Sequence, residues 1–336
     1  MLHRRLRVKF RLGNRATEFS ESRPLLQYKK YIGKYGIDFV EDKPDITLIH
    51  HRLLKEKDLN NPVIILERAD SSSLYQPVTR TNISHPNVKA VFKTTTLRDK
   101  KLHNSDTWSG RYHCSIINKY AKIADVFPPR TLISTADLEK IRVAIPTSMQ
   151  DRFIEYKGFN IDRSRDIDVS FVGVTKYDGF TEPNLINWHR EQAVAKLQKI
   201  KGIKIFVATC GSNEQAIDPR EYKKIVLRSK ICLSPWGMGE WNYRDFHSMY
   251  TGAILLKPNS NHVLTYPVDI FQPDRYVSCS PSFDDLEKKI YNIISNWENF
   301  RDMRIKNNRD LIQSWNWDKR SKEFADLLLW AFKRKL

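Results

Sequence analysis

The sequence has few cysteines and no long apolar run. Cys114, Cys210, Cys232 and Cys279 are the only cysteines in 336 residues, and no two of them have the CxxC spacing typical of zinc or redox centres. This spacing argues against a disulfide framework and against a metal site. The basic start, MLHRRLRVKFRLGNR, precedes no apolar segment as long as a signal peptide or a membrane span requires. We therefore expect a soluble, cytoplasmic protein.

Acidic residues are also in short supply. The chain has 39 Asp and Glu against 57 Lys and Arg, a formal net charge of +18, and the resulting field attracts an anionic partner without specifying which one. Only 12 glycines and 15 prolines occur, whereas hydrophobic residues make up 40% of the chain. This composition excludes a disordered or collagen-like protein. The length predicts two domains, each with its own core.

Short apolar runs in the first half predict buried strands of a parallel sheet. They lie at 6–12, 45–51, 61–70 and 88–95 and are bounded by polar residues. The segments 21–35 and 110–124 are candidate helices, although both could be irregular loops. Residues 142–166 contain Pro146 and a charged, non-periodic run, which is typical of a linker between domains.

The second half alternates strands with helices. Strands are predicted at 166–175, 202–211, 230–235 and 252–258, and helices at 188–201, 220–229 and 243–251, with amphipathic helices near 286–297 and 324–331. We therefore predict an α/β fold of two Rossmann-like domains that face a cleft. The expected units are residues 1–150, residues 151–310 and a C-terminal segment, 311–336. A ligand is expected at the carboxyl ends of the strands.

The segment 229–258, SKICLSPWGMGEWNYRDFHSMYTGAILLKP, contains a glycine loop that leads into a helix. The predicted helix begins near Asn242 and carries Arg244 in its first turn. Unpaired backbone N–H groups and the positive end of the helix dipole favour an anion there. A guanidinium adds two parallel hydrogen bonds, which suits a diphosphate. The alternative is a solvated arginine beside an ordinary strand-to-helix turn.

This segment resembles the donor-binding signature of exostosin-like and related GT-B glycosyltransferases. The residues that carry the resemblance are Ser229-Lys230, Cys232-Leu233, Pro235, Gly237, Arg244 and Gly252-Ala253-Ile254, and a His189-Arg190 pair extends it weakly. The resemblance implies the GT-B fold, with an N-terminal acceptor domain, a C-terminal donor domain and a last helix that packs back on the N-terminal domain. It also implies transfer of a sugar from a UDP- or GDP-sugar to a glycan hydroxyl, without a tightly bound cofactor or metal.

The same resemblance assigns roles around the donor. Arg244 takes the place of the diphosphate-binding arginine, and His247 stands where the family has a ribose-binding Glu, so Glu240 is a substitute candidate for the ribose contact. Gly173, at the end of a strand, permits close approach of the backbone to a ligand. The expected donor-binding residues are Gly173, Val174, Thr175, Lys176, Thr209, Cys210, Ser234, Pro235, Trp236, Gly237, Glu240, Asn242, Tyr243, Arg244, Asp245 and His247.

In an inverting enzyme, the acceptor hydroxyl must lose a proton to a general base, and the resemblance to GT-B enzymes implies that this base usually comes from the N-terminal domain. Asp70, which follows an apolar strand, is the preferred candidate, and His50 and His51 are the other two. Asp70 could instead cap a turn, and the histidines could be satisfied within the sheet. A retaining enzyme would need no base. The loop residues Arg111, Tyr112 and His113 are expected to bind the acceptor sugar.

Two alternatives to a transferase remain. The high positive charge is compatible with a nucleic-acid-binding protein, although the sequence has no zinc-finger, homeodomain or RNP-type motif, and we expect no specific nucleic-acid partner. A catalytically inactive relative that binds a sugar nucleotide is the second alternative. The expected partners are the nucleotide sugar and the glycan acceptor. The basic surface is also compatible with peripheral contact with a membrane.

Overall fold

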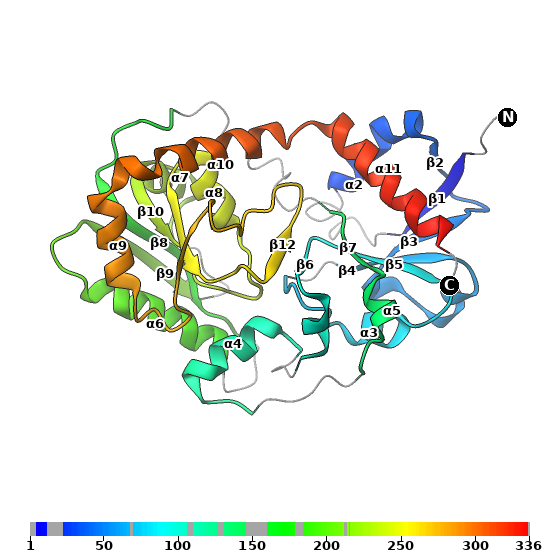
Figure 1. Cartoon of the computed structure of the whole chain (residues 1–336), viewed down its shortest axis with the longest axis horizontal. Coiled ribbons are helices and arrows are strands. Elements are labelled where there is room, and N and C mark those ends of the chain that lie inside the picture. Colours follow the sequence, from blue (N-terminus) through cyan, green and yellow to red (C-terminus); the bar gives the residue numbers. More distant parts are fainter. Residues whose placement is uncertain are drawn as a thin grey trace.

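Two parallel sheets organise the chain into two lobes (Figure 1). The computed structural model describes residues 5–11, 23–67, 70–105, 110–125, 131–145, 160–178, 184–211, 214 and 216–334. Pro146 and most of the predicted linker lie outside these ranges. We call the part built on the sheet of residues 6–143 the first lobe, and the part built on the sheet of residues 167–279 the second lobe.

The first lobe contains a six-stranded sheet in the order β2-β1-β3-β4-β5-β7, and all neighbouring strands are parallel. The strands are β1 (Leu6–Arg11), β2 (Ile37–Phe39), β3 (Ile46–His50), β4 (Val63–Glu67), β5 (Val88–Lys93) and β7 (Ile141–Val143). The helices α2 (Arg23–Tyr31), α3 (Pro77–Asn82) and α5 (Thr135–Leu138) belong to this lobe. The four strands expected from apolar runs are confirmed. The three-residue strands β2 and β7 are too short to show a period.

The second lobe contains a five-stranded parallel sheet in the order β13-β11-β10-β8-β9. Its strands are β8 (Ile167–Lys176), β9 (Ile205–Gly211), β10 (Ser229–Leu233), β11 (Ile254–Pro258) and β13 (Val277–Cys279). The helices are α6 (Leu185–Lys199), α7 (Pro219–Arg228), α8 (Tyr243–Thr251), α9 (Leu286–Ser295) and α10 (Arg301–Gln313). Helices connect most of the parallel strands, as such sheets require. The predicted α/β fold with two parallel-sheet units is confirmed.

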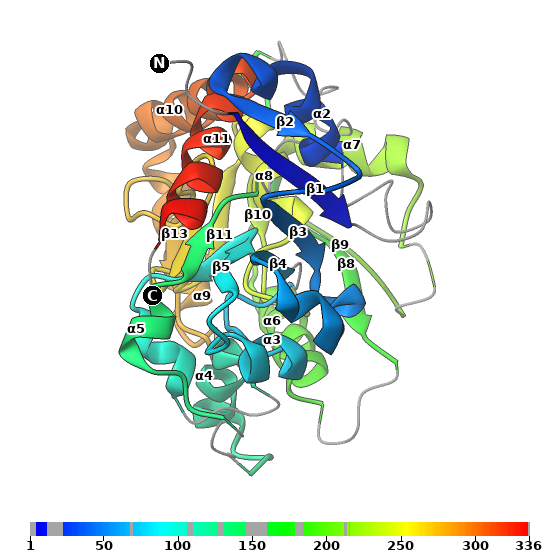
Figure 2. The same ribbon diagram turned by 90° about the vertical axis from the view of Figure 1, so that its right-hand side faces the viewer.

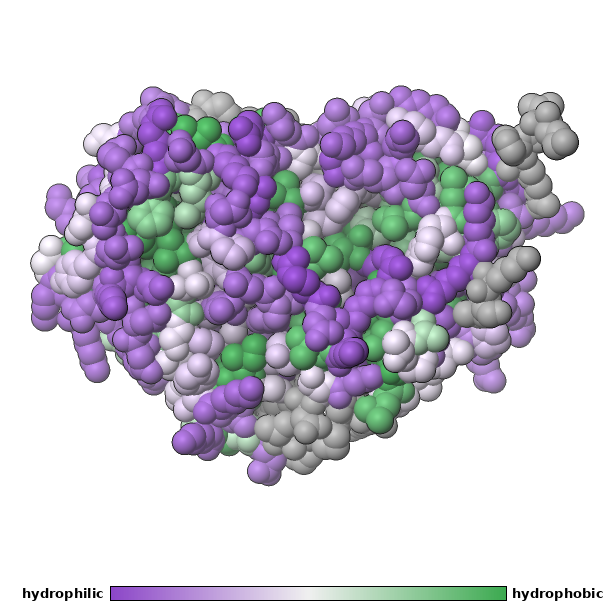
Figure 3. All heavy atoms as spheres, in the orientation of Figure 1, coloured by the Kyte–Doolittle hydropathy of each residue, from purple (hydrophilic) through white to green (hydrophobic). Residues whose placement is uncertain are grey.

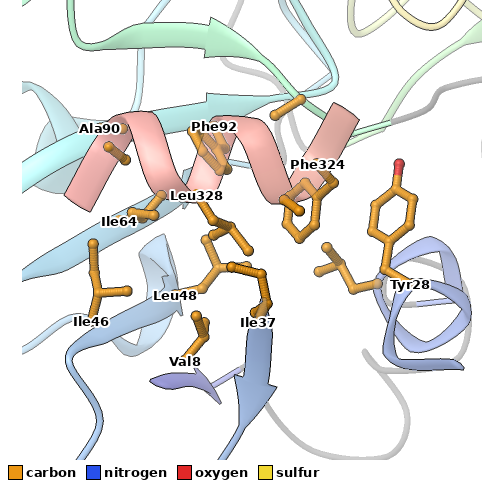
Figure 4. Packing of buried hydrophobic residues seen from close by; sticks show 14 of the residues in the cluster. Val8, Tyr28, Ile37, Ile46, Leu48, Ile64, Ala90, Phe92, Phe324 and Leu328 are labelled. Atoms are coloured by element: carbon orange, nitrogen blue, oxygen red, sulfur yellow. The ribbon is translucent and has the colours of Figure 1, made fainter. Parts of the chain in front are cut away.

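The last helix, α11 (Trp317–Lys333), packs on the first lobe. Figures 1 and 2 show α10 over the second lobe continuing into α11 over the first. Figure 4 shows the apolar face of α11 above the strands, where Phe324 and Leu328 meet Leu48 and Phe92. The ring of Tyr28 on α2 stacks on Phe324, with 4.6 Å between the ring centroids. The returning C-terminal helix is therefore also confirmed.

Replacing Leu328 with alanine tests how much α11 stabilises the first lobe. Leu328 is fully buried in the core beneath α11, so Leu328→Ala loses apolar contacts and leaves a cavity. We expect the free energy of unfolding to fall by about 2–5 kcal/mol, measured by urea denaturation. Asp326→Ala, at an exposed position of the same helix, is the control and should change it by less than ~0.5 kcal/mol. Equal effects of the two variants would contradict this packing.

The lobes also touch through segments distant from α11. Strand β6 (Thr95–Leu97) pairs antiparallel with β12 (Val263–Thr265), one strand from each half of the chain. Helix α4 (Tyr112–Ala121) packs on α6, where Cys114 and Ile117 join a buried cluster with Leu185 and Ile186. Residues 110–124, expected to be a helix or a loop, are thus helical over most of their length, and they lie against the second lobe. A domain boundary at residue 150 stays a prediction.

The face of the molecule seen in Figure 3 is mostly hydrophilic, and its hydrophobic residues show in separate small groups. This distribution agrees with the high content of charged residues, 29% of the chain. Within the described ranges, no helix combines the length and the apolar character needed to cross a membrane.

Candidate functional site

A cavity of about 1020 Å³ opens at the carboxyl ends of the second-lobe strands. Its walls come from the ends of β8 and β9, from α6, α7 and α8, and from the glycine loop before α8, and Asp70 contributes to the wall from the first lobe. The volume is at the upper end of the range of ~300–1,000 Å³ usual for ligand pockets. A ligand site at this edge of the sheet is what the sequence predicts for an α/β fold.

The start of α8 is held by its own side chains. Asn242 Oδ1 accepts a hydrogen bond from the Arg244 backbone N–H at 3.0 Å, and Asp245 Oδ2 accepts one from the Asn242 N–H at 2.9 Å. This arrangement is a capping box. The sequence predicted N–H groups open to an anion at this helix start, and the structure corrects that expectation because the cap already occupies some of them.

Asp245 lies at the centre of a buried network beneath the glycine loop. Its Oδ1 accepts a hydrogen bond from Ser234 Oγ at 2.5 Å and lies 3.2 Å from Lys257 Nζ. All three side chains are fully buried. Burial lowers the pKa of Lys257 to about 8, although Asp245 opposes the shift. Ser234 and Asp245, expected to bind the donor, therefore fix the loop that presents Arg244 and do not line the cavity.

The Arg244 side chain is buried in the cavity wall. Its Nη2 donates to the Val172 carbonyl, and the guanidinium lies 4.7 Å from the centre of the Phe171 ring. Within the described part of the chain, Nε and Nη1 have no hydrogen-bond partner. Unpaired buried donors on a permanent cation are costly. Because Arg244 lines the cavity, we expect an anion bound there to satisfy them.

A second guanidinium, that of Arg190 on α6, lies in the same wall. Its Nε donates to the Val174 carbonyl, and its Nη1 donates to the carbonyls of Pro235 at 3.3 Å and Trp236 at 3.2 Å. Burial, with a smaller contribution from Arg244, lowers the pKa of Arg190 to about 10. Arg190 therefore remains charged at neutral pH.

Gly173, near the end of β8, allows the two guanidiniums to converge. Its φ is +152°, and a Cβ at this position would lie 2.4 Å from Arg244 Nη2 and 3.3 Å from Arg190 Nη2. A larger residue would therefore be strained and would displace Arg244. Two buried positive charges that approach one backbone position are stabilised best by a shared anion.

Further charged residues line the cavity. Arg220, Lys223 and Lys224 on α7 belong to the lining, as do the carboxylates Asp70 and Glu214. With Arg190 and Arg244, the lining holds more cations than carboxylates, which favours an anionic ligand.

The structure brings half of the predicted donor residues together. Eight of them line the cavity: Gly173, Val174, Cys210, Gly237, Asn242, Tyr243, Arg244 and His247. His247 Nδ1 is held 2.8 Å from the hydroxyl of Tyr222, which also lines the cavity. The other eight lie outside the lining: Thr175, Lys176, Thr209, Ser234, Pro235, Trp236, Glu240 and Asp245. Trp236 is fully buried and stacks on His189 with 5.4 Å between ring centroids.

The three candidate bases differ in exposure and in whether they line the cavity. Asp70 is exposed and lines the cavity. His50 and His51, at the end of β3, are buried and lie outside the lining. Burial, together with the neighbouring His50, lowers the pKa of His51 to about 4, so His51 is uncharged at neutral pH. Of the three, only Asp70 shares the cavity lining with the arginine pair.

The predicted acceptor residues lie away from the cavity lining. Arg111 is buried, with its guanidinium 4.8 Å from the centre of the Tyr75 ring. The Tyr112 N–H donates to Ser73 Oγ at 2.8 Å, and His113 is fully buried beside Glu240. Of these contacts, that of His113 with Glu240 joins the two lobes. The acceptor role of these three residues stays a prediction.

The sequence pattern assigned no role to Arg190, Tyr222 or the cations of α7. An arginine inside a helix shows no local sign that it reaches a strand end, and only the weak His189-Arg190 resemblance marked it. Among the described residues, no group of three or more His, Cys, Asp or Glu side chains could hold a metal ion.

No protein-family model matches the sequence. No curated protein matches it either. Similar solved structures include an alpha-glucosyltransferase in complex with UDP-glucose and DNA containing an abasic site, at 12% identity and a TM-score of 0.47 over 97% of this chain and 99% of that chain. An alpha-glucosyltransferase in complex with UDP has a TM-score of 0.46 at 12% identity, over 97% of this chain and 99% of that chain. An alpha1,3-fucosyltransferase has a TM-score of 0.47 at 12% identity, over 98% of this chain and 91% of that chain. These three structures are glycosyltransferases, and each is similar to this chain in overall arrangement.

Proposed function

We propose that the protein is a GT-B glycosyltransferase that moves a sugar from a nucleoside diphosphate sugar to a hydroxyl group of a glycan acceptor. The observation that supports this proposal best is the convergence of Arg190 and Arg244 at Gly173 in the cavity wall. Both guanidiniums line the cavity, and Asp70 lines it as well. The resemblance of the glycine loop to a donor-binding signature independently predicts the same class of ligand, a nucleoside diphosphate sugar.

In this proposal, the arginine pair stabilises the leaving group. As the bond between the anomeric carbon and the phosphate oxygen breaks, the electron pair stays with the diphosphate and its negative charge increases. Arg244 and Arg190 are already held in a buried wall, so they stabilise this charge without reorganising. Arg244 has Nε and Nη1 available for phosphate oxygens. Arg190 has Nη2 available, because its Nε and Nη1 already donate to backbone carbonyls.

Asp70 is the proposed general base. It would accept the proton of the acceptor hydroxyl while the hydroxyl oxygen forms a bond to the anomeric carbon. Attack opposite the departing diphosphate inverts the configuration at that carbon. The position of Asp70, on the first-lobe side of a cavity whose other walls are in the second lobe, supports this role.

A thermal-shift panel of UDP, GDP, uridine, guanosine and inorganic phosphate tests the proposed donor class. One nucleoside diphosphate is expected to stabilise the protein by about 2.7 kcal/mol at a hundred times its Kd. The matching nucleoside, which lacks the diphosphate, should give a much smaller shift because it cannot reach the arginine pair. Absence of stabilisation by either diphosphate, or equal stabilisation by the nucleoside, would contradict the proposal.

A further inference from the structure

The glycine loop of the second lobe touches the first lobe through its backbone. A Cβ on Gly239 would lie 1.7 Å from the Asp70 carbonyl oxygen and 2.9 Å from the Ser71 backbone nitrogen. No side chain fits in this space, so glycine is required by close approach alone. The backbone of this loop (residues 234–242), which we call the donor loop, therefore contacts Asp70, the residue that we propose as the base.

The next residue, Glu240, reaches across the same contact. Its side chain is fully buried, and Oε2 accepts a hydrogen bond from the Ser72 backbone N–H at 2.8 Å. The same carboxylate lies 3.5 Å from His113 Nδ1 and 3.9 Å from His262 Nε2. A carboxylate taken out of water in this way is tolerated only if it is charge-paired and hydrogen-bonded.

The cluster of Glu240, His113 and His262 contains groups of opposite charge. Burial alone would raise the pKa of Glu240, but His113, His262 and the Ser72 N–H lower it to about 2. Burial alone would likewise lower the pKa of His113, but Cys114 and Glu240 raise it to about 10. Burial lowers the pKa of His262 to about 4 although Glu240 opposes the shift, and the charges of His113 and Arg98 add to the lowering. At neutral pH the cluster is a carboxylate paired with one charged imidazole.

The turn that follows Asp70 is otherwise held by its own lobe. The Ser73 N–H donates to Ser71 Oγ at 3.2 Å, and the Leu74 N–H donates to His103 Nδ1 at 2.9 Å. The N–H of Ser72 is instead bonded to Glu240, in the opposite lobe. One hydrogen bond to a charged acceptor thus fixes this turn relative to the donor loop.

We propose that Glu240 is a positioning residue that holds the turn of residues 70–74 against the donor loop and so sets the place of Asp70 relative to the arginine pair. This inference rests on the proposed function for the role of Asp70, but the contact itself does not depend on it. The sequence suggested a ribose contact for Glu240. The structure assigns it to the junction of the lobes, four residues before Arg244. A misplacement of the base by ~1 Å can lower the rate about a hundredfold.

Glu240→Gln tests this proposal, because glutamine keeps the shape and an acceptor oxygen but removes the charge that His113 faces. Glu287→Gln, at an exposed position at the start of α9, is the matched control. We expect amide hydrogen exchange of the 70–74 segment to accelerate about tenfold or more in Glu240→Gln and to stay unchanged in the control. Unchanged exchange in Glu240→Gln would overturn the proposal. If that variant does not fold, Gly239→Ala is measured instead. Its added methyl group would push the loop backbone away from Asp70, and we expect the same acceleration.

A kinetic measurement separates positioning from simple destabilisation. With UDP-glucose as donor and water as acceptor, the rate of UDP release at saturating donor should fall at least about tenfold in Glu240→Gln, while KM stays within about twofold. A rise in KM with an unchanged saturated rate would overturn the positioning role. If wild-type protein binds no nucleoside diphosphate, the proposed function fails, whereas the exchange result still decides whether Glu240 fixes the turn.

Discussion

Arg244→Ala is expected to weaken the binding of the nucleoside diphosphate about a hundredfold. The guanidinium lies in the cavity wall with two nitrogens that have no hydrogen-bond partner within the described residues. Two charge-assisted hydrogen bonds to a phosphate contribute roughly 3 kcal/mol together, and each 1.4 kcal/mol corresponds to about a factor of ten in Kd. Isothermal titration calorimetry with UDP and GDP measures the loss.

Two controls interpret this result. Arg309→Ala removes an exposed arginine of α10 that pairs with the adjacent Asp310, and it should leave Kd unchanged. Arg244→Lys keeps the charge but loses the planar fork, so its affinity should be intermediate. The fold should persist in Arg244→Ala, because Asn242 and Asp245 cap the helix without the Arg244 side chain. A wild-type Kd in a folded Arg244→Ala protein would remove the proposed diphosphate site.

Asp70→Asn is expected to lower turnover by roughly 10²–10⁴-fold, the usual range for loss of a general base, while the binding of nucleoside diphosphate stays unchanged. Asparagine keeps the size of the side chain but cannot accept the proton of the attacking hydroxyl. The arginine pair belongs to the second lobe, so its contacts with the diphosphate are retained. Turnover is measured as UDP released from UDP-glucose, with water or a glycan as acceptor.

The matched control is Asp302→Asn, at an exposed position in the first turn of α10, for which wild-type turnover is expected. Wild-type turnover in Asp70→Asn would remove Asp70 as the base. His50 and His51 would then be the remaining candidates from the sequence, although both are buried away from the cavity. A retaining reaction, which needs no such base, would also agree with that outcome, and the configuration of the product distinguishes the two cases.

The sequence predicted what depends on local pattern. Apolar runs located the main strands of both sheets, and a helix start near Asn242 was predicted from the glycine loop before it. At Gly173, a glycine at a strand end, the sequence predicted close approach of the backbone to a ligand. The structure shows which atoms approach it: the guanidinium nitrogens of Arg244 and Arg190, where a ligand was expected.

Contacts between distant segments could not be predicted. Arg190 lies in the middle of α6 and reaches the cavity only because α6 packs beside the end of β8. Glu240 and Trp236 stand in a loop whose residue types suggest a ligand, yet both side chains are directed into buried contacts. The short strands β6 and β12 form one ladder from residues far apart in the chain. None of these features produces a periodic hydrophobic pattern in the sequence.

The position of α11 has a consequence for how the protein is made. The core of the first lobe is formed by strands between residues 6 and 143, but it is covered by a helix that begins at Trp317. On the ribosome, the apolar faces of these strands are synthesised long before the helix that shields them. The lobe therefore cannot complete its core until residues 317–333 have emerged, so an intermediate with exposed apolar surface persists during synthesis.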